Sequence, residues 1–213
     1  SPSLPGLRLL AAGAGLGLLR PEPPVAELQM SGRTMGTTYN VKYRPTPNTL
    51  TVKDLQIEVD TLLAEINHTM STYDQESELS RFNRLRTTDW VPASSSLRAV
   101  LKAALEIGAQ SEGAFDVTVG PLVNLWGFGP EVHSDRIPLD RDIAAARARS
   151  GLDKITLSET QPAIRKHRPD VFLDLSGIAK GYGVDRVAEL MTAHGIEHYM
   201  VEIGGEIRVR GLK

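Results

Sequence analysis

Apolar residues recur at intervals of three and four positions after Thr51, and this spacing predicts an amphipathic helix that runs to Met70. Thr51 and Asp54 stand in the capping-box spacing at its start, with Asp in place of the usual Glu. The positions expected to face inward are Val52, Leu55, Val59, Leu62, Leu63, Ile66 and Met70.

Two further helices follow from the same spacing. A short one is expected to start near Ser77, with Leu79, Phe82 and Leu85 on one face. A longer one is expected over Ser94–Glu112, with Gly113 as its stop. Its expected inward positions are Leu97, Val100, Leu101, Ala104, Leu105 and Ile107.

Strands and helices then mix without strict alternation. Residues 114–130 have no clean period and are expected to form an ordered loop. Helices are predicted over residues 139–149 and 178–194, and strands over residues 37–44, 154–157, 163–166, 171–175, 197–203 and 206–210. This order predicts an α+β fold in which a mixed or antiparallel sheet packs with helices.

The first thirty residues differ in composition from the rest. Leu9–Leu19 is an apolar run flanked by Arg8 and Arg20, shorter than a bilayer span and similar to the apolar core of a secretory signal. A proline-rich linker follows it. We expect residues 1–30 to be a signal-like or anchor-like segment and residues 31–213 to be the folded domain, which favours export over the alternative of a tail on a cytosolic protein.

Charge and composition exclude several classes of function. The chain has 24 Lys and Arg against 26 Asp and Glu, a net charge of −2. It therefore lacks the basic excess that general nucleic-acid binding requires. Cysteine is absent, which excludes disulfides, thiolate zinc sites and cysteine nucleophiles from this chain. The five histidines form no ligand cluster and no Ser-His-Asp order is visible.

The segment DLSGIAKG offers the strongest candidate chemistry. A strand is expected to end at Asp174, a turn follows at Gly177, and a helix begins with Lys180 in its first turn. A helix N-terminus beside a lysine favours a phosphate or pyrophosphate. A helix cap with a solvated lysine is the alternative.

Four other segments are weaker candidates. GAFDVTVG presents Phe115 and Asp116 in a glycine-flanked loop, although a core ring and a turn-capping carboxylate explain them as well. Met35 lies in a turn and could line a ring pocket. Tyr73 follows the first helix, where a plain helix exit is the alternative, and Glu202 and Glu206 flank a Gly-Gly turn as either a functional pair or solvated acids.

In this order, these segments resemble the ApbE family of FAD:protein FMN transferases. The matching stretches run from Ser31 to Lys213 and are TMGTTYNV, MSTYDQESELSRFN, GAFDVTVGPLVNLWGF, DLSGIAKGYGVDRV and EIGGEIRVRG. The resemblance implies an ApbE-like α+β fold and an enzyme that binds FAD and Mg²⁺. It implies transfer of FMN to a threonine or serine hydroxyl of an acceptor protein, with release of AMP.

The resemblance also implies a partner and a location. Family members serve acceptor subunits of membrane electron-transport systems of the Rnf, Nqr or nitrous-oxide-regulator type, and they are exported and often tethered to the inner membrane. A periplasmic protein is therefore expected. Two alternatives remain open: hydrolysis of FAD to FMN and AMP, and a flavin-binding or assembly protein without catalytic activity.

Site residues carry over by position. The resemblance implies that Met35 and Tyr73 lie near the flavin ring and that Asp174 and Lys180 contact the cofactor. It implies that Ala114, Phe115 and Asp116 also contact FAD. It implies that the backbone carbonyl of Gly177 is one ligand of Mg²⁺. Family members continue past the GGEI hairpin into segments that supply metal-binding Asp and Thr side chains. The chain is accordingly expected to lack the family's C-terminal part, and no catalytic base is identified.

Overall fold

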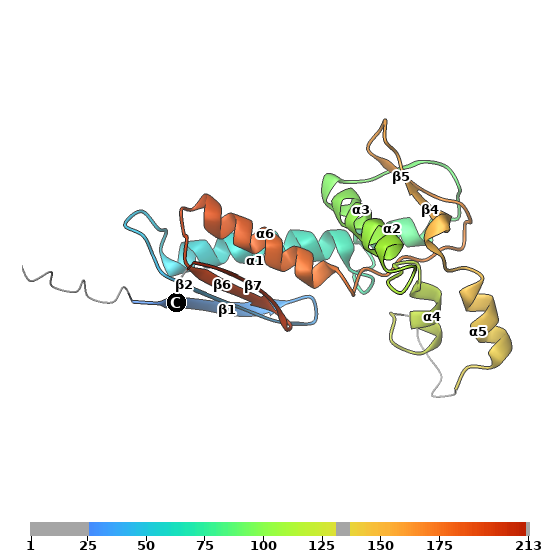
Figure 1. Cartoon of the computed structure of the whole chain (residues 1–213), viewed down its shortest axis with the longest axis horizontal. Coiled ribbons are helices and arrows are strands. Elements are labelled where there is room, and N and C mark those ends of the chain that lie inside the picture. Colours follow the sequence, from blue (N-terminus) through green and yellow to red (C-terminus); the bar gives the residue numbers. More distant parts are fainter. Residues whose placement is uncertain (1–25, 131–136, 212–213) are drawn as a thin grey trace, which may run out of the picture.

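A four-stranded antiparallel sheet and two long helices form one end of the molecule (Figure 1). The computed structural model describes residues 26–130 and 137–211. The strands lie in the order β1-β2-β6-β7, and α1 and α6 cover one face of the sheet. The elements are β1 (Leu28–Thr34), β2 (Thr37–Tyr43), α1 (Val52–Met70), α6 (Ala179–Ala193), β6 (Tyr199–Ile203) and β7 (Glu206–Arg210).

The middle of the chain forms the other end of the molecule, on the right of Figure 1. A small antiparallel sheet in the order β3-β5-β4 lies there with the helices α2, α3, α4 and α5. The elements are α2 (Glu78–Arg84), β3 (Val91–Pro92), α3 (Ser95–Gln110), α4 (Gly120–Leu125), α5 (Asp140–Arg147), a 3-10 turn (Leu152–Lys154), β4 (Ile155–Leu157) and β5 (Ala163–Lys166). The expected α+β class is thus confirmed.

Helix α1 forms as its spacing predicts. Thr51 is the N-cap: its hydroxyl accepts a hydrogen bond from the Asp54 amide at 3.2 Å and donates to the Asp54 carboxylate at 2.7 Å. The side chains that the helix buries are Leu55, Val59, Leu63, Ile66 and Met70. This stripe packs on the sheet and against α6.

Strand β1 was not predicted. Its sequence, LQMSGRT, buries only Met30, so it has no apolar alternation to reveal it. Within the described part of the chain it is an edge strand whose one partner is β2, and its register Thr34↔Thr37 leaves a two-residue turn at Met35 and Gly36. Both turn residues have positive φ, +49° and +72°, as a tight hairpin of the type I′ class requires.

Two inward positions were predicted wrongly. Leu85 lies just past the end of α2 and Ile107 lies on the outer side of α3, and both are exposed. Gly108 is buried in place of Ile107, because a side chain there would meet Leu152. The expected loop at residues 114–130 also contains a helix, α4, whose Pro121 stands in the first turn where a missing N–H costs nothing.

The segment Val171–Leu175 is extended and buried but pairs with no strand, contrary to the prediction of a strand. Its backbone is held by other groups. Asn83 accepts from the Leu173 amide and donates to the Leu173 carbonyl, each at 2.8 Å, and the Asp174 amide donates to the Val117 carbonyl. We call residues 171–175 the strap, since they lead directly into α6.

Lys166 is a buried cation in the smaller part of the molecule. Its side chain is 1% exposed, its ammonium donates to the carbonyls of Asn83 and Leu85, and it lies 4.9 Å from the centre of the Phe82 ring. Burial lowers the pKa of Lys166 to about 8, because the charged form loses water that these contacts only partly replace.

This burial gives a pH dependence of stability with a defined sign. The folded protein loses the Lys166 proton near pH 8, whereas the unfolded chain keeps it to about pH 10.4. Between these values the unfolded state binds more protons, so stability rises with pH by up to about 1.4 kcal/mol per unit. Urea unfolding from pH 7 to 9.5 is expected to show this rise relative to Lys166→Met. The same change of unfolding free energy with pH in the two proteins would contradict this prediction.

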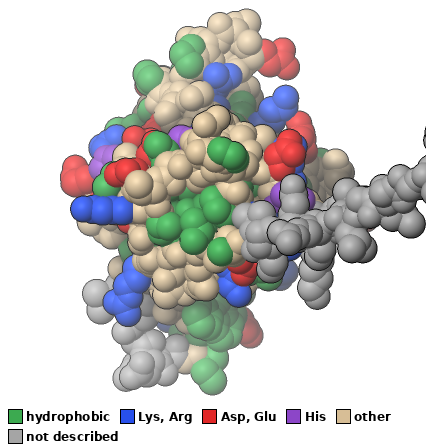
Figure 2. All heavy atoms as spheres, turned by 90° about the vertical axis from the view of Figure 1, so that its left-hand side faces the viewer, with side chains coloured by type: hydrophobic (Ala, Val, Ile, Leu, Met, Phe, Trp, Pro, Cys, Tyr) green, Lys and Arg blue, Asp and Glu red, His purple; other side chains and the backbone are tan. Residues whose placement is uncertain are grey.

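Among residues 26–130 and 137–211 no helix is both long and apolar enough to cross a membrane. The predicted signal-like run at residues 9–19 lies outside the described residues. Figure 2 looks at the end of the molecule where α1 begins. On this face the basic and acidic side chains are interspersed around a central hydrophobic area.

Candidate functional site

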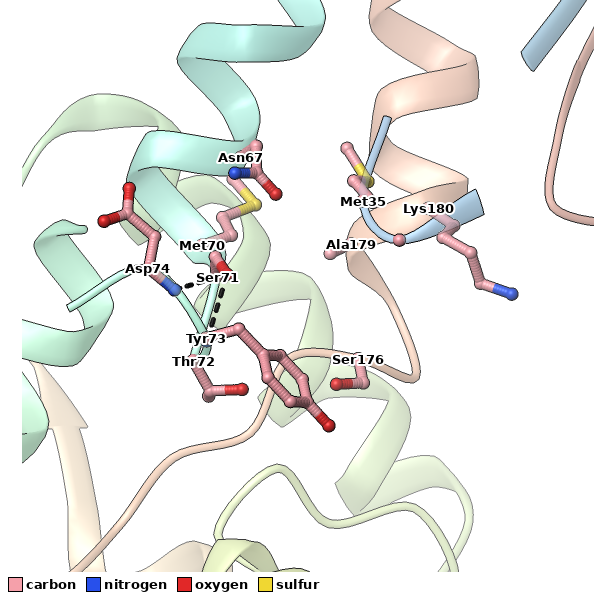
Figure 3. A pocket seen from close by; sticks show the side chains of 11 residues that line it. Met35, Asn67, Met70, Ser71, Thr72, Tyr73, Asp74, Ser176, Ala179 and Lys180 are labelled. Atoms are coloured by element: carbon pink, nitrogen blue, oxygen red, sulfur yellow. Dashed lines mark hydrogen bonds between the residues drawn. The ribbon is translucent and has the colours of Figure 1, made fainter. Parts of the chain in front are cut away.

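The candidate site is a cavity of about 660 Å³ where three structural elements end. The β1–β2 turn, the end of α1 with the residues that follow it, and the start of α6 surround it (Figure 3). The lining residues are Met35, Gly36, Asn67, Met70, Ser71, Thr72, Tyr73, Asp74, Ser176, Ala179 and Lys180. The structure therefore brings Met35, Tyr73 and Lys180, three residues that the sequence predicted for one site, to a single cavity.

Met35 occupies an unusual backbone position. It is one of two described non-glycine residues with positive φ, which costs energy that the tight turn offsets. Its side chain reaches α6, where its Cε lies 3.1 Å from the point that a Cβ on Gly183 would occupy. The absence of a side chain at Gly183 therefore leaves room for this flexible thioether at the cavity wall.

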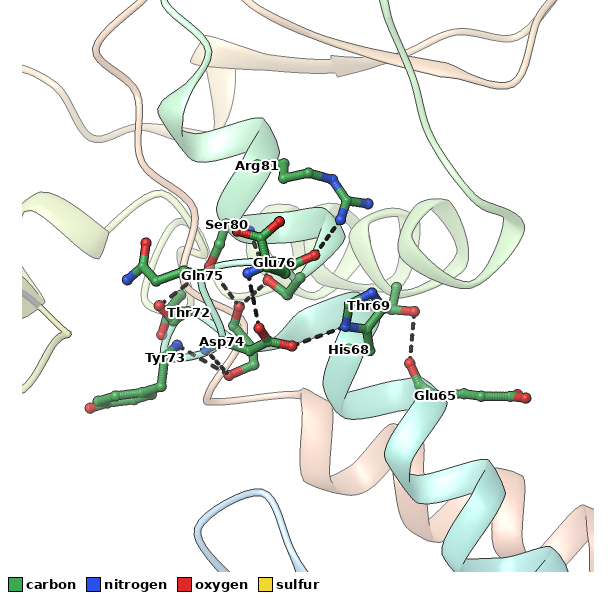
Figure 4. Close-up of polar contacts among 12 residues, drawn as sticks. Glu65, His68, Thr69, Thr72, Tyr73, Asp74, Gln75, Glu76, Ser80 and Arg81 are labelled. Atoms are coloured by element: carbon green, nitrogen blue, oxygen red, sulfur yellow. Dashed lines mark hydrogen bonds and ion pairs between the residues drawn. The ribbon is translucent and has the colours of Figure 1, made fainter.

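Tyr73 projects its ring into open space beside the cavity, with 64% of the residue exposed. Its hydroxyl donates to the Phe128 carbonyl at 2.7 Å, which links the segment after α1 to the segment after α4. Its backbone is held by the Ser71 hydroxyl, which accepts from the amides of Tyr73 and Asp74, each at 3.1 Å. Figure 4 shows this polar network. An exposed ring on a fixed backbone is suited to stack on a flat ligand.

Asp74 serves this network rather than the cavity's chemistry. Its carboxylate accepts from the Glu76 amide at 2.9 Å and pairs with His68 Nδ1 at 3.0 Å. These two hydrogen bonds hold the pKa of Asp74 below its usual range. The predicted helix exit at residues 71–74 is thus also part of the cavity wall.

Lys180 lies in the first turn of α6, whose N-cap residue Ile178 provides no side-chain cap. Asp174 caps the preceding turn by accepting from the Ser176 amide at 2.7 Å. The Lys180 ammonium donates to the Gly204 carbonyl at 3.2 Å, and Figure 3 shows it turned away from Tyr73. A lysine at the positive end of a helix dipole favours an anion such as a phosphate.

The predicted residues Ala114, Phe115 and Asp116 lie outside the cavity lining. The Phe115 ring approaches to 3.2 Å of the point that a Cβ on Gly177 would occupy. Asp116 accepts from the amide and the hydroxyl of Thr118, at 2.7 and 2.6 Å. In this structure Asp116 is therefore a turn-capping residue, the alternative that the sequence left open.

Gly177 lines a second cavity of about 430 Å³ between α3, α6 and β7. Asp185 and Glu206 line it too, but Asp185 is paired with Arg208 at 2.7 Å. Within the described residues no group of three or more His, Cys, Asp or Glu side chains could hold a metal ion. Mg²⁺ is usually held by one or two carboxylates, with water in its other positions. The two carboxylates that line this second cavity are the ion-paired Asp185 and the exposed Glu206, so these described donors do not fit a Mg²⁺ site.

Glu202 and Glu206 do not form a functional carboxylate pair. Glu202 accepts from the Gly205 amide at 2.7 Å and from Asn40 Nδ2 at 3.0 Å, and these bonds lower the pKa of Glu202. Glu206 is exposed on the edge strand β7. Glu202 is therefore a structural group of the β6–β7 turn.

Sequence analysis did not identify several cavity residues. Asn67 is a polar position within the apolar stripe of α1, and this interruption was the one available signal. Ser176 lies inside a segment already chosen, but nothing marked its side chain. The cavity depends on three chain segments, residues 35–36, 67–74 and 176–180, that meet only in the fold.

Comparison with known proteins gives a consistent result. The model of the ApbE family matches residues 35–213. The FAD:protein FMN transferase of Vibrio cholerae is 48% identical over 204 residues, which cover 96% of this chain and 60% of that protein. The corresponding protein of Haemophilus influenzae is 42% identical over 207 residues, which cover 95% of this chain and 60% of that protein.

Solved structures agree with this. The flavin transferase ApbE from Vibrio cholerae matches with a TM-score of 0.86 and 49% identity, covering 89% of this chain and 61% of that chain. The apo flavinyl transferase ApbE of Pseudomonas stutzeri matches with a TM-score of 0.83 and 37% identity, covering 88% and 62%. The chain spans about 60% of the length of these relatives.

Proposed function

The chain belongs to the ApbE family, and on that premise we propose that the complete protein is an FAD:protein FMN transferase. It moves FMN from FAD to a threonine or serine hydroxyl of an acceptor protein and releases AMP. The names of its relatives support the reaction class.

One observation carries this proposal: Met35, Tyr73 and Lys180, from three separate elements, line one cavity. The Lys180 ammonium is bound to the Gly204 carbonyl and turned away from Tyr73. FAD has flat rings joined by a pyrophosphate, so it needs both apolar faces and a cation. Met35 and Tyr73 supply the former, and Lys180 with the start of α6 supplies the latter. The family resemblance also leads us to propose contacts of Ala114, Phe115, Asp116 and Asp174 with FAD, although none of these residues lines the cavity.

The reaction needs one bond exchange. The acceptor hydroxyl loses its proton and its oxygen forms a bond to the phosphorus on the FMN side. The bond from that phosphorus to the bridging oxygen breaks, and AMP leaves with the bridging oxygen and its negative charge. Lys180 offsets negative charge on the phosphates, while Tyr73 and Met35 hold the flavin end in place. Catalysis of this kind rests on positioning and charge neutralisation.

We further propose that the reaction depends on Mg²⁺, with the Gly177 carbonyl as one ligand. The described residues do not supply a full ligand set, so this dependence rests on the family resemblance. Acceptors of the Rnf, Nqr or nitrous-oxide-regulator type and a periplasmic location are proposed on the same ground. The apolar run at residues 9–19, with its possible role as a membrane tether, supports the location.

The test is a transfer assay on the complete protein with FAD, Mg²⁺ and an acceptor domain of the Nqr type. Covalent attachment of FMN, detected by in-gel flavin fluorescence and by mass, is the expected result. Release of AMP without any acceptor would indicate FAD hydrolysis instead. Saturable FAD binding with neither product would indicate a flavin-binding protein.

Removal of the Tyr73 ring is expected to weaken FAD binding. Tyr73→Ala deletes an exposed stacking face, and such contacts contribute about 1–3 kcal/mol per ring, so the Kd should rise about tenfold. Tyr73→Phe keeps the ring and loses only the hydrogen bond to Phe128, so it should bind FAD nearly as well. Flavin fluorescence titration measures both. Equal loss in the two variants would contradict a stacking role.

A further inference from the structure

We infer that the Gly204–Gly205 turn between β6 and β7, clamped by Glu202, is the element that positions Lys180 at the cavity. This inference deepens the proposed function and rests on it, because Lys180 matters through the anion that it binds. It assigns a role to Glu202 and Gly204, which neither the sequence nor the relatives' names assign.

The turn touches Lys180 at two points. The Lys180 ammonium donates to the Gly204 carbonyl at 3.2 Å. Lower on the side chain, Lys180 Cδ lies 3.1 Å from the point that a Cβ on Gly204 would occupy. The lysine stem therefore lies against a glycine, and the carbonyl of the same glycine holds the charged end.

Gly204 is required here for two physical reasons. Its φ is +53°, in the left-handed region where a side chain costs energy. A Cβ at this position would also lie 2.8 Å from Thr37 Cγ2, which is closer than carbon atoms pack. Thr37 follows the Met35–Gly36 turn, so a shift at Gly204 would disturb both walls of the cavity.

Glu202 fixes the turn from the other side. One carboxylate oxygen accepts from the Gly205 amide at 2.7 Å, and the other accepts from Asn40 Nδ2 at 3.0 Å. Asn40 stands opposite Glu202 in the β2–β6 register, and the Gly204 amide donates to the Thr38 carbonyl at 3.1 Å. The turn is therefore anchored to β2 by both side-chain and backbone hydrogen bonds, and its Gly204 carbonyl has a fixed direction.

The arrangement explains how a mobile lysine is kept at one place. A lysine side chain loses conformational entropy when a ligand orders it. If the protein already holds the side chain in place, ligand binding costs less of this entropy. The β1–β2 and β6–β7 turns lie at the same end of the sheet, beside the start of α6 (Figure 1). Lys180 bridges from α6 to the second of these turns.

The first test compares two alanine substitutions in the same turn. Gly204→Ala places a methyl group against Thr37 and the Lys180 stem, whereas Gly205→Ala introduces strain at φ +95° with no atom within 4 Å of its Cβ. The Kd for FAD should rise about tenfold or more in Gly204→Ala and less than about threefold in Gly205→Ala. Equal effects would mean that turn strain alone matters, which would overturn the inference.

The second test removes the hydrogen bonds of Glu202 to the turn and to Asn40, and it leaves Gly204 unchanged. Glu202→Ala should weaken FAD binding about three- to tenfold, since it deletes two hydrogen bonds remote from the cavity lining. Glu202→Gln keeps an acceptor for the Gly205 amide and should restore most of the affinity. A Glu202→Gln protein as weak as Glu202→Ala would contradict the positioning role.

A third readout does not use FAD. Acetylation of Lys180 by acetic anhydride, followed by mass spectrometry, reports how firmly its amine is held, with exposed Lys102 as the internal standard. Labelling should be several-fold faster in Glu202→Ala than in the unmodified protein. The unmodified protein could fail to bind FAD while Lys180 is still labelled faster in Glu202→Ala. That result would contradict the proposed function but support the positioning of Lys180 by the turn. If the unmodified protein binds FAD but Glu202→Ala changes neither the labelling rate of Lys180 nor the Kd for FAD, the turn does not position Lys180.

Discussion

Lys180→Ala is expected to weaken FAD binding about 30- to 100-fold. The substitution removes the ammonium group of the one lysine among the described residues that line the cavity, beside a helix N-terminus that favours anions. A hydrogen bond to a charged group contributes about 1.5–3 kcal/mol, which corresponds to a loss of this size. Isothermal titration calorimetry at low and high salt measures it, and the affinity of the unmodified protein should fall more steeply with salt than that of the variant.

The matched control is Lys102→Ala, which removes an exposed lysine on the outer side of α3. It should bind FAD as the unmodified protein does. Lys180→Arg keeps the charge on a stiffer group and should lose less affinity than Lys180→Ala. Equal affinity in Lys180→Ala and the unmodified protein would mean that the pyrophosphate is bound elsewhere.

Asn83→Ala is expected to lower the free energy of unfolding by about 3 kcal/mol. The Asn83 side chain forms both hydrogen bonds of the buried Leu173 backbone, each at 2.8 Å. Without it, a buried N–H and a buried C=O lose their partner, at about 1–3 kcal/mol each. Urea unfolding followed by circular dichroism measures the change.

Asn83→Asp separates the two bonds. Above the carboxyl pKa, Asp accepts from the Leu173 amide but has no donor for the Leu173 carbonyl, so its stability should be low. Below that pKa, its O–H can donate to the carbonyl, so its stability should rise toward that of the unmodified protein. Asn48→Ala, in the exposed loop after β2, should change stability by less than about 0.5 kcal/mol. An Asn83→Ala protein as stable as Asn48→Ala would show that the strap does not depend on this side chain.

Secondary structure could be predicted where the residue pattern of a single segment is enough to identify the element. Helix α1 was predicted correctly because its apolar stripe and its Thr51–Asp54 cap are local. Strand β1 was missed because an edge strand that buries only Met30 has no alternation. The strap was taken for a strand because Val171, Leu173 and Leu175 alternate and are buried, but the partner of Leu173 is a side chain on α2.

The site could be predicted only in part for the same reason. Met35, Tyr73 and Lys180 stand in recognisable segments, and the fold brings them to one cavity. The role of Gly204 depends on a contact between a turn and a lysine 24 residues earlier, which no local pattern reveals. An Asp in a glycine-flanked loop is more often a turn-capping residue than a ligand, and the bonds of Asp116 to Thr118 in the structure agree with that interpretation.

In the proposed function, the cavity binds FAD through its pyrophosphate as well as its rings. The most direct measurement is a fluorescence titration of the complete protein with FAD and, in parallel, with riboflavin, which has the same flavin ring but no phosphate. The account predicts saturable binding of FAD at least tenfold tighter than that of riboflavin, with the difference lost in Lys180→Ala. Equal affinity for the two flavins, or a difference that Lys180→Ala leaves intact, would contradict it.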